Sequence, residues 1–580
     1  MRATTLNAAA VPAGAGSAAA PAVDPVTLEI IRHTLGSIAD EIEVDITRTA
    51  YSPLIYEFKD YAVGLLDPDG QLMTHAERGP LIFTTDLDLP LRDCLEALAA
   101  DNVKLGPSDV ALNNYAGVCG QHLNNVNAYC PAYANGELIG YAAIRMHWAD
   151  VGGKEPGSTT NDSNSIFQEG FTLRAVRIMV DGEWNRELLR VIECNTRLPE
   201  QVLGDLKSQV FAAVKGARLL GELARRYGAA ALKSAVHRIW DESEQLARQI
   251  VAQIPDGVYE AESWLDDDGL SDDIVPIPIA VTVAGSDVTI DFRRIADQLK
   301  GPFNSGNGAA TAARNAFKFI LGGGRRADAG VFRPLKMVTR PRSFLTAEFP
   351  APLARWSAPL PTVADTIIKA FSQAVPERAA AGHHGSTGAY YFYGYDDQNR
   401  FYKHMDAAPG GWGALSTEDG PGPYKTLNHG DSADIPIEIV ERTYPVRALS
   451  YRFRPDSGGR GKWRGGLGTE KRFLTLKPVL FSCMFDRSKC AAWGLYGGEP
   501  GRSGGVTIRL PDGSEQFGCK FPTTELPTGT EVIVAGGGGG GWGSQDERDP
   551  RLIERDIRFG YVTQSPQAAA PRSERAVESA

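Results

Sequence analysis

The chain has 580 residues, of which 43% are hydrophobic and 23% charged. This length exceeds what one hydrophobic core usually serves, so we expect two or three packed regions. Its formal net charge of -11 offers no general attraction for nucleic acid or anionic lipid, and no long block of Lys or Arg offsets it. The seven cysteines are scattered without a C-x-x-C pair, which argues against a zinc knuckle or disulfide framework and favours a cytoplasmic protein. No run of about 18 apolar residues predicts a membrane-spanning helix.

The N-terminal part predicts one long helix followed by a sheet. Residues 1–23 are rich in Ala, Gly and Pro and predict a flexible tail rather than a signal peptide. Asp24 followed by Pro25 is a typical helix start, and apolar residues then recur at helical spacing at Ile31, Leu35, Ile38, Ile42 and Ile46. Turn signals at residues 67–70, 135–136 and 181–182 separate strand-like runs, so we expect hairpins there.

The middle of the chain predicts helices and strands in alternation. A helical pair is expected over about residues 199–227 and 229–254, closed by a glycine and by a proline respectively. Alternation of period two returns at residues 277–292 and predicts strands. Two further helices are expected near residues 309–321 and 362–375.

Loops and short strands are expected toward the C-terminus. Glycine-rich and polar composition predicts surface or site-lining loops at residues 322–330 and 383–436. Beyond about Tyr444 the pattern is one of short strands and glycine turns, followed by a closing helix capped by Asp549. Residues after Gln564 predict a loose tail.

These elements together predict an α+β fold, sheet-rich, with helical pairs inserted and a glycine-rich β region at the C-terminus. The chain is expected to divide into a disordered tail, an N-terminal region with the candidate metal site, a central mixed region, a C-terminal β-rich region and a second disordered tail. The expected bounds are residues 1–23, 24–255, 256–443, 444–565 and 566–580.

A candidate site lies where predicted strands end. His147 and Asp150 close the strand-like run YAAIRMHWAD just before a Gly-Gly turn, and a rigid strand end is a usual position for a site residue. His122 lies in the preceding hairpin and shares that neighbourhood if the two strands pair. Asp60 opens the strand DYAVGLL and is the natural carboxylate to complete a set of two histidines and two aspartates.

This predicted set suits one divalent metal ion, Zn, Mn or Fe(II), and an open coordination position would activate water or polarise a carbonyl. On this interpretation His122, His147 and Asp150 are also the candidate catalytic residues. Ordinary hydrogen-bonded histidines are the other interpretation, because a His near a strand end often has a structural role.

Other motifs carry weaker signals. The glycine-rich stretches at residues 457–468 and 536–541 could cradle an anion or form structural turns, but neither has the G-K-[ST] ending of a nucleotide-binding P-loop. Ser52 and Cys119 lack a nucleophile elbow and are interpreted as structural. The aromatic residues within 389–402 predict either an apolar substrate pocket or an ordinary pair of strands.

Sequence blocks along nearly the whole chain, from Asp24 to about Thr563, resemble the hydantoinase B/oxoprolinase family. The resemblance is carried, in order, by DPVTLEIIRHTLGSIADEI, RTAYSP, LLDPDGQLM, HWADVGGKEPGS, FQEG, NTRLPEQVLGDLKSQ, YPVRALSYRFRPDSGGRGKWRGGLG, WGLYGGEPG and GGGGGGWGSQDERDP. The family includes N-methylhydantoinase and oxoprolinase B parts, lactam-hydrolysing relatives, and large subunits of acetone and acetophenone carboxylases.

The resemblance implies an enzyme that works with a hydantoinase A-type partner in a hetero-oligomer. The partner is expected to bind ATP and phosphorylate a small amide or ketone substrate, and the B-type chain is expected to act on the activated species with a divalent metal. Cyclic-amide hydrolysis, on a hydantoin, an oxoproline or a lactam, is the leading function. ATP-dependent carboxylation of a ketone is the alternative, and a non-catalytic scaffold subunit is the second alternative.

This sequence departs from the family pattern at positions where the family has Asp or His. His147 and Asp150 are kept, whereas the departures are Arg78, Ile82, Asn114, Asn125 and Trp148. Three interpretations follow: a working site of unusual specificity, an active site that has lost its metal, or a non-catalytic paralogue.

Overall fold

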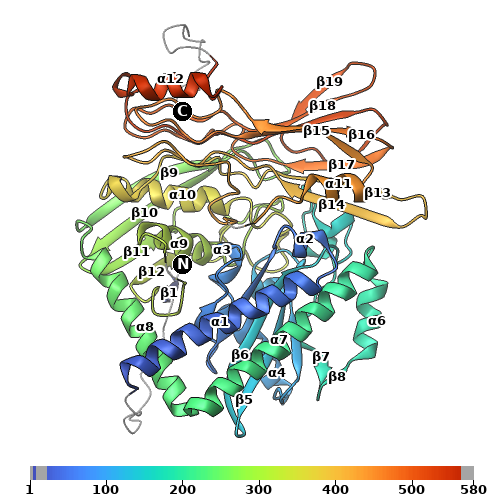
Figure 1. The fold of residues 1–580 in the computed structure, drawn as a ribbon, viewed down its shortest axis with the longest axis vertical. Helices are drawn as coiled ribbons and strands as arrows, with labels where there is room; N and C mark the ends of the chain where they lie inside the picture. Colours follow the sequence, from blue (N-terminus) through green and yellow to red (C-terminus); the bar gives the residue numbers. More distant parts are fainter. Residues whose placement is uncertain (1–3, 8–22, 325, 431, 564–580) are drawn as a thin grey trace.

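The computed structural model describes residues 4–7, 23–324, 326–430 and 432–563, and it confirms the predicted α+β fold (Figure 1). Four sheets are formed by these residues, one in the N-terminal part, one in the middle and two toward the C-terminus. Figure 1 shows the C-terminal sheets as a layer above the other two. One hydrophobic cluster joins the N-terminal and central sheets with their helices, so these two parts share a core.

The N-terminal sheet has seven strands in the order β3-β2-β6-β5-β4-β7-β8. The predicted hairpins are confirmed, because β2 pairs with β3, β5 with β6 and β7 with β8. The strands are β2 (Tyr61–Leu66), β3 (Leu72–His75), β4 (Val110–Asn113), β5 (Asn125–Ala134), β6 (Glu137–His147), β7 (Val176–Val180) and β8 (Glu183–Trp184).

Two long helices cover this sheet. The first, α1 (Pro25–Thr49), begins as predicted, since the Asp24 side chain accepts hydrogen bonds from the backbone amides of Val26 and Thr27. It packs against α7 (Pro199–Tyr227), which lies on β5 and β6. The apolar faces of both helices are buried, which fixes the strands whose ends carry the candidate site.

The remaining helices of the N-terminal part connect its strands or extend the helical layer. The predicted helical pair is confirmed, with α8 as its second member. They are α2 (Pro53–Tyr56), α3 (Leu81–Thr84), α4 (Asp88–Ala100), α5 (Ala116–Cys119), α6 (Arg186–Cys194), α8 (Ala229–Val251) and the short 3-10 helices η1 (Pro156–Ser158) and η2 (Ile166–Gln168).

The central sheet has five strands in the order β1-β12-β11-β10-β9, with α10 packed on β9 and β10. The two predicted helices appear as α9 and α10. The elements are β9 (Gly257–Leu265), β10 (Val275–Ala284), β11 (Asp287–Asp291), β12 (Leu335–Thr339), α9 (Gly308–Ile320), α10 (Leu360–Phe371) and η3 (Pro376–Arg378).

The first strand corrects the prediction of a flexible tail. Residues Thr4–Asn7 form β1, which pairs antiparallel with β12, because the edge of β12 offers free backbone groups. The other residues of the predicted tail, apart from Val23, lie outside the described residues, as do those of the predicted C-terminal tail.

Two sheets form the C-terminal layer, in the orders β14-β13-β17-β20 and β15-β16-β21-β18-β19. The expected boundary at residue 443 is crossed by this pairing, since β13 and β14 precede it and β17 and β20 follow it. The elements are β13 (Ala389–Tyr395), β14 (Phe401–Ala407), β15 (Val446–Phe453), β16 (Thr469–Thr475), β17 (Val479–Met484), β18 (Gly505–Arg509), β19 (Glu515–Gly518), β20 (Thr524–Leu526), β21 (Glu531–Ala535), α11 (Ile437–Thr443), η4 (Gln545–Glu547) and α12 (Pro550–Arg558).

Strands β13 and β14 lie within residues 383–436, where composition predicted surface or site-lining loops. Residues 389–394 of β13 are all buried, so the strand shows no alternation of period two. Its glycine-rich flanks also favour a loop over a strand when only the sequence is considered. Of the two interpretations of the aromatic cluster, the pair of strands is therefore present, and one of its tyrosines also lines a cavity described below.

The glycine run at residues 536–541 packs inside the C-terminal layer. The amides of Gly539 and Gly540 donate hydrogen bonds to the carbonyls of Gly466 (3.0 Å) and Gly382 (2.8 Å). A Cβ atom added at residues 538–541 would lie only 1.8–2.1 Å from a carbonyl oxygen of a neighbouring segment. Close approach of backbones therefore explains these glycines, and the bonded amides do not form a cradle for an anion.

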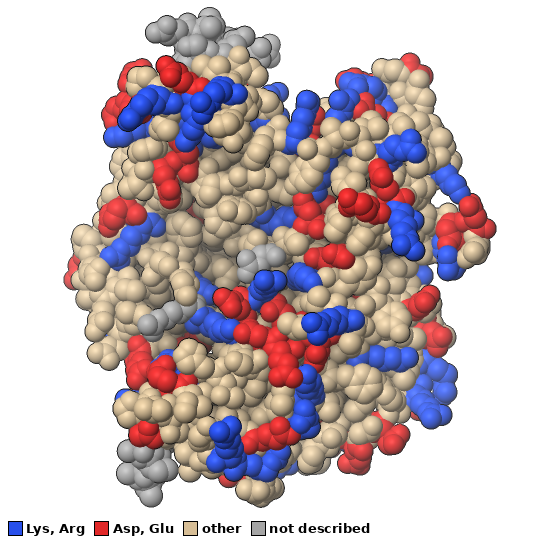
Figure 2. All heavy atoms as spheres, viewed as in Figure 1, with Lys and Arg blue, Asp and Glu red and all other residues tan. Residues whose placement is uncertain are grey.

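The surface shown in Figure 2 carries basic and acidic side chains intermingled rather than a broad area of one sign. Within the described residues, no helix is long and apolar enough to cross a membrane. All seven cysteines are free thiols.

Candidate active site

Three strand ends of the N-terminal sheet meet at one buried cavity. Asp60 directly precedes β2 and its carbonyl accepts a hydrogen bond from the backbone amide of His147, the last residue of β6 (3.1 Å). Asn125, the first residue of β5, is the cross-strand partner of His147. The turn before β5 carries His122, so the strand pairing expected from the sequence brings these residues together. Asp60, His122 and His147 all line the cavity.

The two histidines form a close pair. Their ring centroids lie 4.7 Å apart with the planes at 74°. Among the described residues, no group makes a hydrogen bond of normal geometry with Nδ1 of His122 or with either ring nitrogen of His147. Burial lowers the pKa of His122 to about 3, and burial together with the neighbouring His122 lowers the pKa of His147 well below its usual value. Both rings are therefore neutral at pH 7 and present lone pairs.

A chain of hydrogen bonds orients His122. Its Nε2 lies 3.0 Å from Oδ1 of Asn125, whose Nδ2 donates to Oε1 of Gln121 (2.9 Å). The Gln121 amide donates in turn to Asp86 (2.8 Å), which forms a fully buried ion pair with Arg145. Because Asn125 presents an acceptor, Nε2 carries the proton and the lone pair of His122 is on Nδ1.

Asp60 is the carboxylate of the cavity. Its Oδ1 atom is buried and has no hydrogen-bond partner in the described part of the chain, and burial raises its pKa to about 7 against the opposing effect of Lys403. Lys403 is itself buried and donates to the carbonyls of Ala149 (2.9 Å) and Gly157 (3.1 Å). Burial lowers the pKa of Lys403 to about 8, although Asp150 acts in the opposite direction.

The structure places Asp150 apart from this group. Its oxygens accept hydrogen bonds from the amides of Gly157 (2.9 Å) and Arg197 (2.7 Å), and the Arg197 guanidinium forms an ion pair with it at 2.9 Å. Thr196 Oγ1 adds a further hydrogen bond. Asp150 does not line the cavity, and its carboxylate is occupied in fixing the loop after β6.

The cavity is also lined by residues that no single motif identifies. Tyr391 belongs to the aromatic residues within 389–402, for which a substrate pocket was one interpretation, and Thr387 and His429 lie in the segment 383–436 that was predicted to form surface or site-lining loops. No sequence pattern indicated Thr159, Arg355 or Trp356. The cavity is small, about 40 Å³ in volume, which is room for a few water-sized groups.

The side chains that line the cavity are of the types that bind a divalent metal. Two neutral imidazoles and one carboxylate, with unpartnered nitrogen and oxygen atoms on the same cavity, are the ligand types that Zn, Mn and Fe(II) prefer. Among the described residues, however, no three His, Cys, Asp or Glu side chains stand together as a complete ligand group. Binding would therefore need a small rotation of one side chain, or a water or substrate as third ligand.

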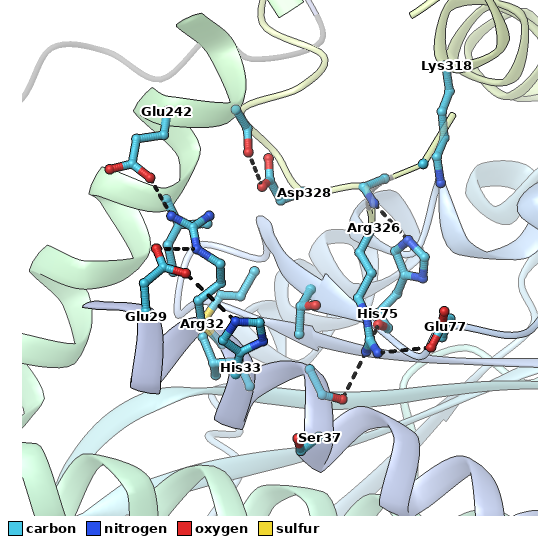
Figure 3. Close-up of a pocket in the computed structure, with 18 of the residues that line it drawn as sticks. Glu29, Arg32, His33, Ser37, His75, Glu77, Glu242, Lys318, Arg326 and Asp328 are labelled. Atoms are coloured by element: carbon cyan, nitrogen blue, oxygen red, sulfur yellow. Dashed lines mark hydrogen bonds and ion pairs between the residues drawn. The ribbon is translucent and has the colours of Figure 1, made fainter. Parts of the chain in front are cut away.

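A larger hollow, about 880 Å³ in volume, lies between α1, α8 and the end of α9 (Figure 3). Its charged groups are engaged in structural contacts: Arg32 pairs with Glu29 and Glu242, and Arg326 pairs with Glu77. The imidazole of His75 accepts from the amide of Ala327 and has its other nitrogen at the carbonyl of Ala76. The smaller cavity holds unpartnered donors and is the better candidate for chemistry.

Two positions of departure from the family pattern have structural roles here. Trp148 is fully buried and donates from Nε1 to Oε1 of Gln209 (3.0 Å). The Asn114 side chain accepts from the amide of Leu173 (2.6 Å) and donates to the carbonyl of Leu123 (2.7 Å). Neither lines the cavity.

Comparisons with known proteins agree with this architecture. The family model described as hydantoinase B/oxoprolinase matches residues 24–545. A putative B-type subunit of a D-/L-hydantoinase from Pseudomonas sp. (strain NS671) is 29% identical over 93% of both chains. The beta subunit of caprolactamase from Pseudomonas jessenii is 26% identical over 93% of this chain and 94% of that protein.

The fold is also found in a solved structure. The crystal structure of ATP-dependent caprolactamase from Pseudomonas jessenii matches with a TM-score of 0.85 at 24% identity, covering 93% of this chain and 95% of that chain. Since the family model matches most of the chain, this protein belongs to the hydantoinase B/oxoprolinase family.

Proposed function

We propose that this chain is the catalytic B-type subunit of an ATP-dependent two-component enzyme that hydrolyses a cyclic amide, such as a hydantoin, an oxoproline or a lactam. The observation that carries the proposal is the cavity in which His122, His147 and Asp60 present unpartnered donor atoms. Membership of the hydantoinase B/oxoprolinase family supports the reaction class, and the relatives named as hydantoinase and caprolactamase subunits support the substrate class.

His122, His147 and Asp60 would hold one divalent ion, with Asp150 fixing the neighbouring loop rather than binding. A bound ion at such a site polarises a carbonyl and lowers the pKa of a bound water. The chain's own groups prepare the site: Asn125 sets the tautomer of His122, and burial keeps both imidazoles neutral at pH 7.

ATP is assigned to a hydantoinase A-type partner. The glycine run of this chain has its amides bonded to other backbone segments, and no P-loop sequence is present. Both relatives compared above are named as subunits of larger enzymes. A stable complex with the partner is expected to bury well above about 1,000 Å².

The test is co-expression with a hydantoinase A-type protein, followed by ATP hydrolysis assays with cyclic amides and, separately, with ketones plus bicarbonate. Turnover that depends on a cyclic amide is the expected result. Turnover with ketone plus bicarbonate but not with cyclic amides would show that the enzyme is a carboxylase. The absence of turnover with every substrate would favour a scaffold subunit. Robust ATP hydrolysis by the isolated chain would contradict the assignment of ATP to the partner.

Metal binding is tested by elemental analysis of wild type and His147→Ala, with His33→Ala as matched control because the His33 side chain is 81% exposed. His147→Ala should lose most of the metal and activity, while His33→Ala keeps both. Equal metal in all three proteins, or none in any, would show that the paired histidines are structural.

A further inference from the structure

Arg355 is a buried cation whose hydrogen-bond partners are neutral. The residue is only 3% exposed. Its Nε donates to Oδ1 of Asn161 (2.7 Å) and its Nη1 to the hydroxyl of Tyr391 (3.0 Å), and the guanidinium lies 5.5 Å from the Tyr391 ring centroid. Its Nη2 is buried without a partner. Within the described residues no carboxylate forms an ion pair with this guanidinium, and the buried Glu169 acts on it only from beyond ion-pairing distance. Because buried charges in proteins are normally paired, an anion at Nη2 would complete the set of contacts.

The missing anion has a place beside the histidine pair. Arg355 lines the same cavity as His122 and His147. The side chains of Thr159 and Thr387 line it too. The Thr159 hydroxyl interacts with Tyr393, whereas the Thr387 hydroxyl is buried without a hydrogen-bond partner among the described residues. The cavity therefore offers unused hydrogen-bond donors on Arg355 and Thr387, in addition to the atoms of the proposed metal ligands.

The backbone around Arg355 holds it in this position. The amide of Leu353 donates to the buried carboxylate of Glu169 (2.9 Å), and the amides of Trp356 and Ala358 donate to the carbonyls of Leu353 and Arg355 (2.9 Å each). The turn fixes the backbone of Arg355, and the hydrogen bonds to Asn161 and Tyr391 fix its guanidinium, so Nη2 is preorganised for a ligand.

We infer that Arg355, with the hydroxyl of Thr387, binds an oxyanion group of the substrate next to the histidine pair. The inference rests on the proposed function and deepens it, since it makes the species bound here an anion, either a phosphoryl or a carboxylate group. Guanidinium suits both, because its planar array of N–H groups matches their oxygens. The size of the cavity suits one such group and excludes a whole nucleotide.

The test measures binding of inorganic phosphate and of acetate to the full-length chain by calorimetry, after dialysis against a chelator so that a metal cannot hold the anion. Loss of a charged hydrogen-bond donor should weaken binding by roughly 10- to 100-fold in Arg355→Gln. Arg551→Gln is the matched control, because the Arg551 side chain is 88% exposed, and it should bind as wild type does.

Thr387→Val keeps the shape of the side chain and removes one hydrogen-bond donor, so it should weaken anion binding by a smaller factor than Arg355→Gln does. This variant tests the inference if Arg355→Gln does not fold. Equal affinity in wild type and in the folded variants at Arg355 or Thr387, or no binding of either anion to wild type, would overturn the inference. Tighter phosphate than acetate would identify a phosphoryl group as the natural occupant, and the reverse order would identify a carboxylate.

The two proposals fail separately. If the anion binds through Arg355 but the complex with its partner turns over no cyclic amide, the anion site stands and the proposed reaction is wrong. If the complex hydrolyses a cyclic amide but Arg355→Gln leaves the anion affinity unchanged, the proposed reaction is supported and the proposed anion site is wrong.

Discussion

Gly539→Ala tests whether close backbone packing of glycine segments stabilises the C-terminal layer. The added Cβ would lie 2.0 Å from the carbonyl oxygen and 2.3 Å from the carbonyl carbon of Trp412. Both atoms are backbone, so the clash is not relieved by turning a side chain. Relief requires the two segments to separate by about 1 Å or more, since Cβ contacts below about 3 Å are not tolerated.

The cost follows from what that separation breaks. Overpacking of a well-packed interior costs about 1–3 kcal/mol. Separation also strains two backbone hydrogen bonds, from Gly539 to Gly466 (3.0 Å) and from Gly459 to Gly539 (2.8 Å). Each contributes about 1 kcal/mol. We therefore expect a loss of about 3–5 kcal/mol, and a fall of roughly 6–10 °C if about 250 residues melt as one unit.

Thermal melting of wild type and Gly539→Ala by circular dichroism measures this loss. Gly324→Ala is the matched control, because an added Cβ there meets no atom within 4 Å and the backbone is not left-handed, so its melting temperature should stay within about 1–2 °C of wild type. If Gly539→Ala also melts within a degree or so of wild type, the glycine segments are not in contact as described.

Three further changes have defined outcomes. Asp406→Asn should lower stability by about 3–5 kcal/mol in urea unfolding, because it removes a carboxylate that forms ion pairs with two buried lysines. The stability of Lys403→Met relative to wild type, measured by urea unfolding, should be highest near pH 7 and should fall toward pH 10. The folded pKa of Lys403, about 8, lies below the unfolded value of 10.5, so wild type gains stability as pH rises through this window. Asn125→Asp should lower the melting temperature without raising the metal content. The new carboxylate would face His122 and Oε1 of Gln121, and not an empty ligand position. A higher metal content in this variant would contradict the prediction.

Local patterns in the sequence were sufficient for the helices and hairpins of the first half. The cap at Asp24, the glycine after α7 and the turn residues between strands act through neighbouring backbone groups, so their effect can be read from the sequence alone. Strand β1 could not be predicted in this way, because it depends on a partner edge more than 300 residues away. Strands β13 and β14 were only one of two interpretations of the aromatic residues, because β13 is buried on both faces and lacks the alternation that would have selected a strand.

The candidate site shows the same division. Asp60 directly precedes β2 and His147 ends the adjacent β6, so choosing residues at the ends of predicted strands was sufficient to name two that lie together. Asp150 lies only three residues beyond His147, but the chain turns there and Arg197 from another segment takes up its carboxylate. Sequence spacing cannot reveal such a competing partner. Arg355 was missed for the converse reason, since its significance lies in a partner that it lacks.

The position of the cavity has a consequence for how the chain works. Its lining begins at Phe58 beside the N-terminal sheet, includes Arg355 and Trp356 from the turn before α10, and ends at Met484 on β17 of the C-terminal layer. No single sheet therefore carries a complete site, and the residues come together only when the three parts pack. A buried cation and buried unpartnered donors cost stability in each part. The shared core and the glycine packing must offset that cost, so changes far from the cavity that loosen the layers should weaken ligand binding as well as stability.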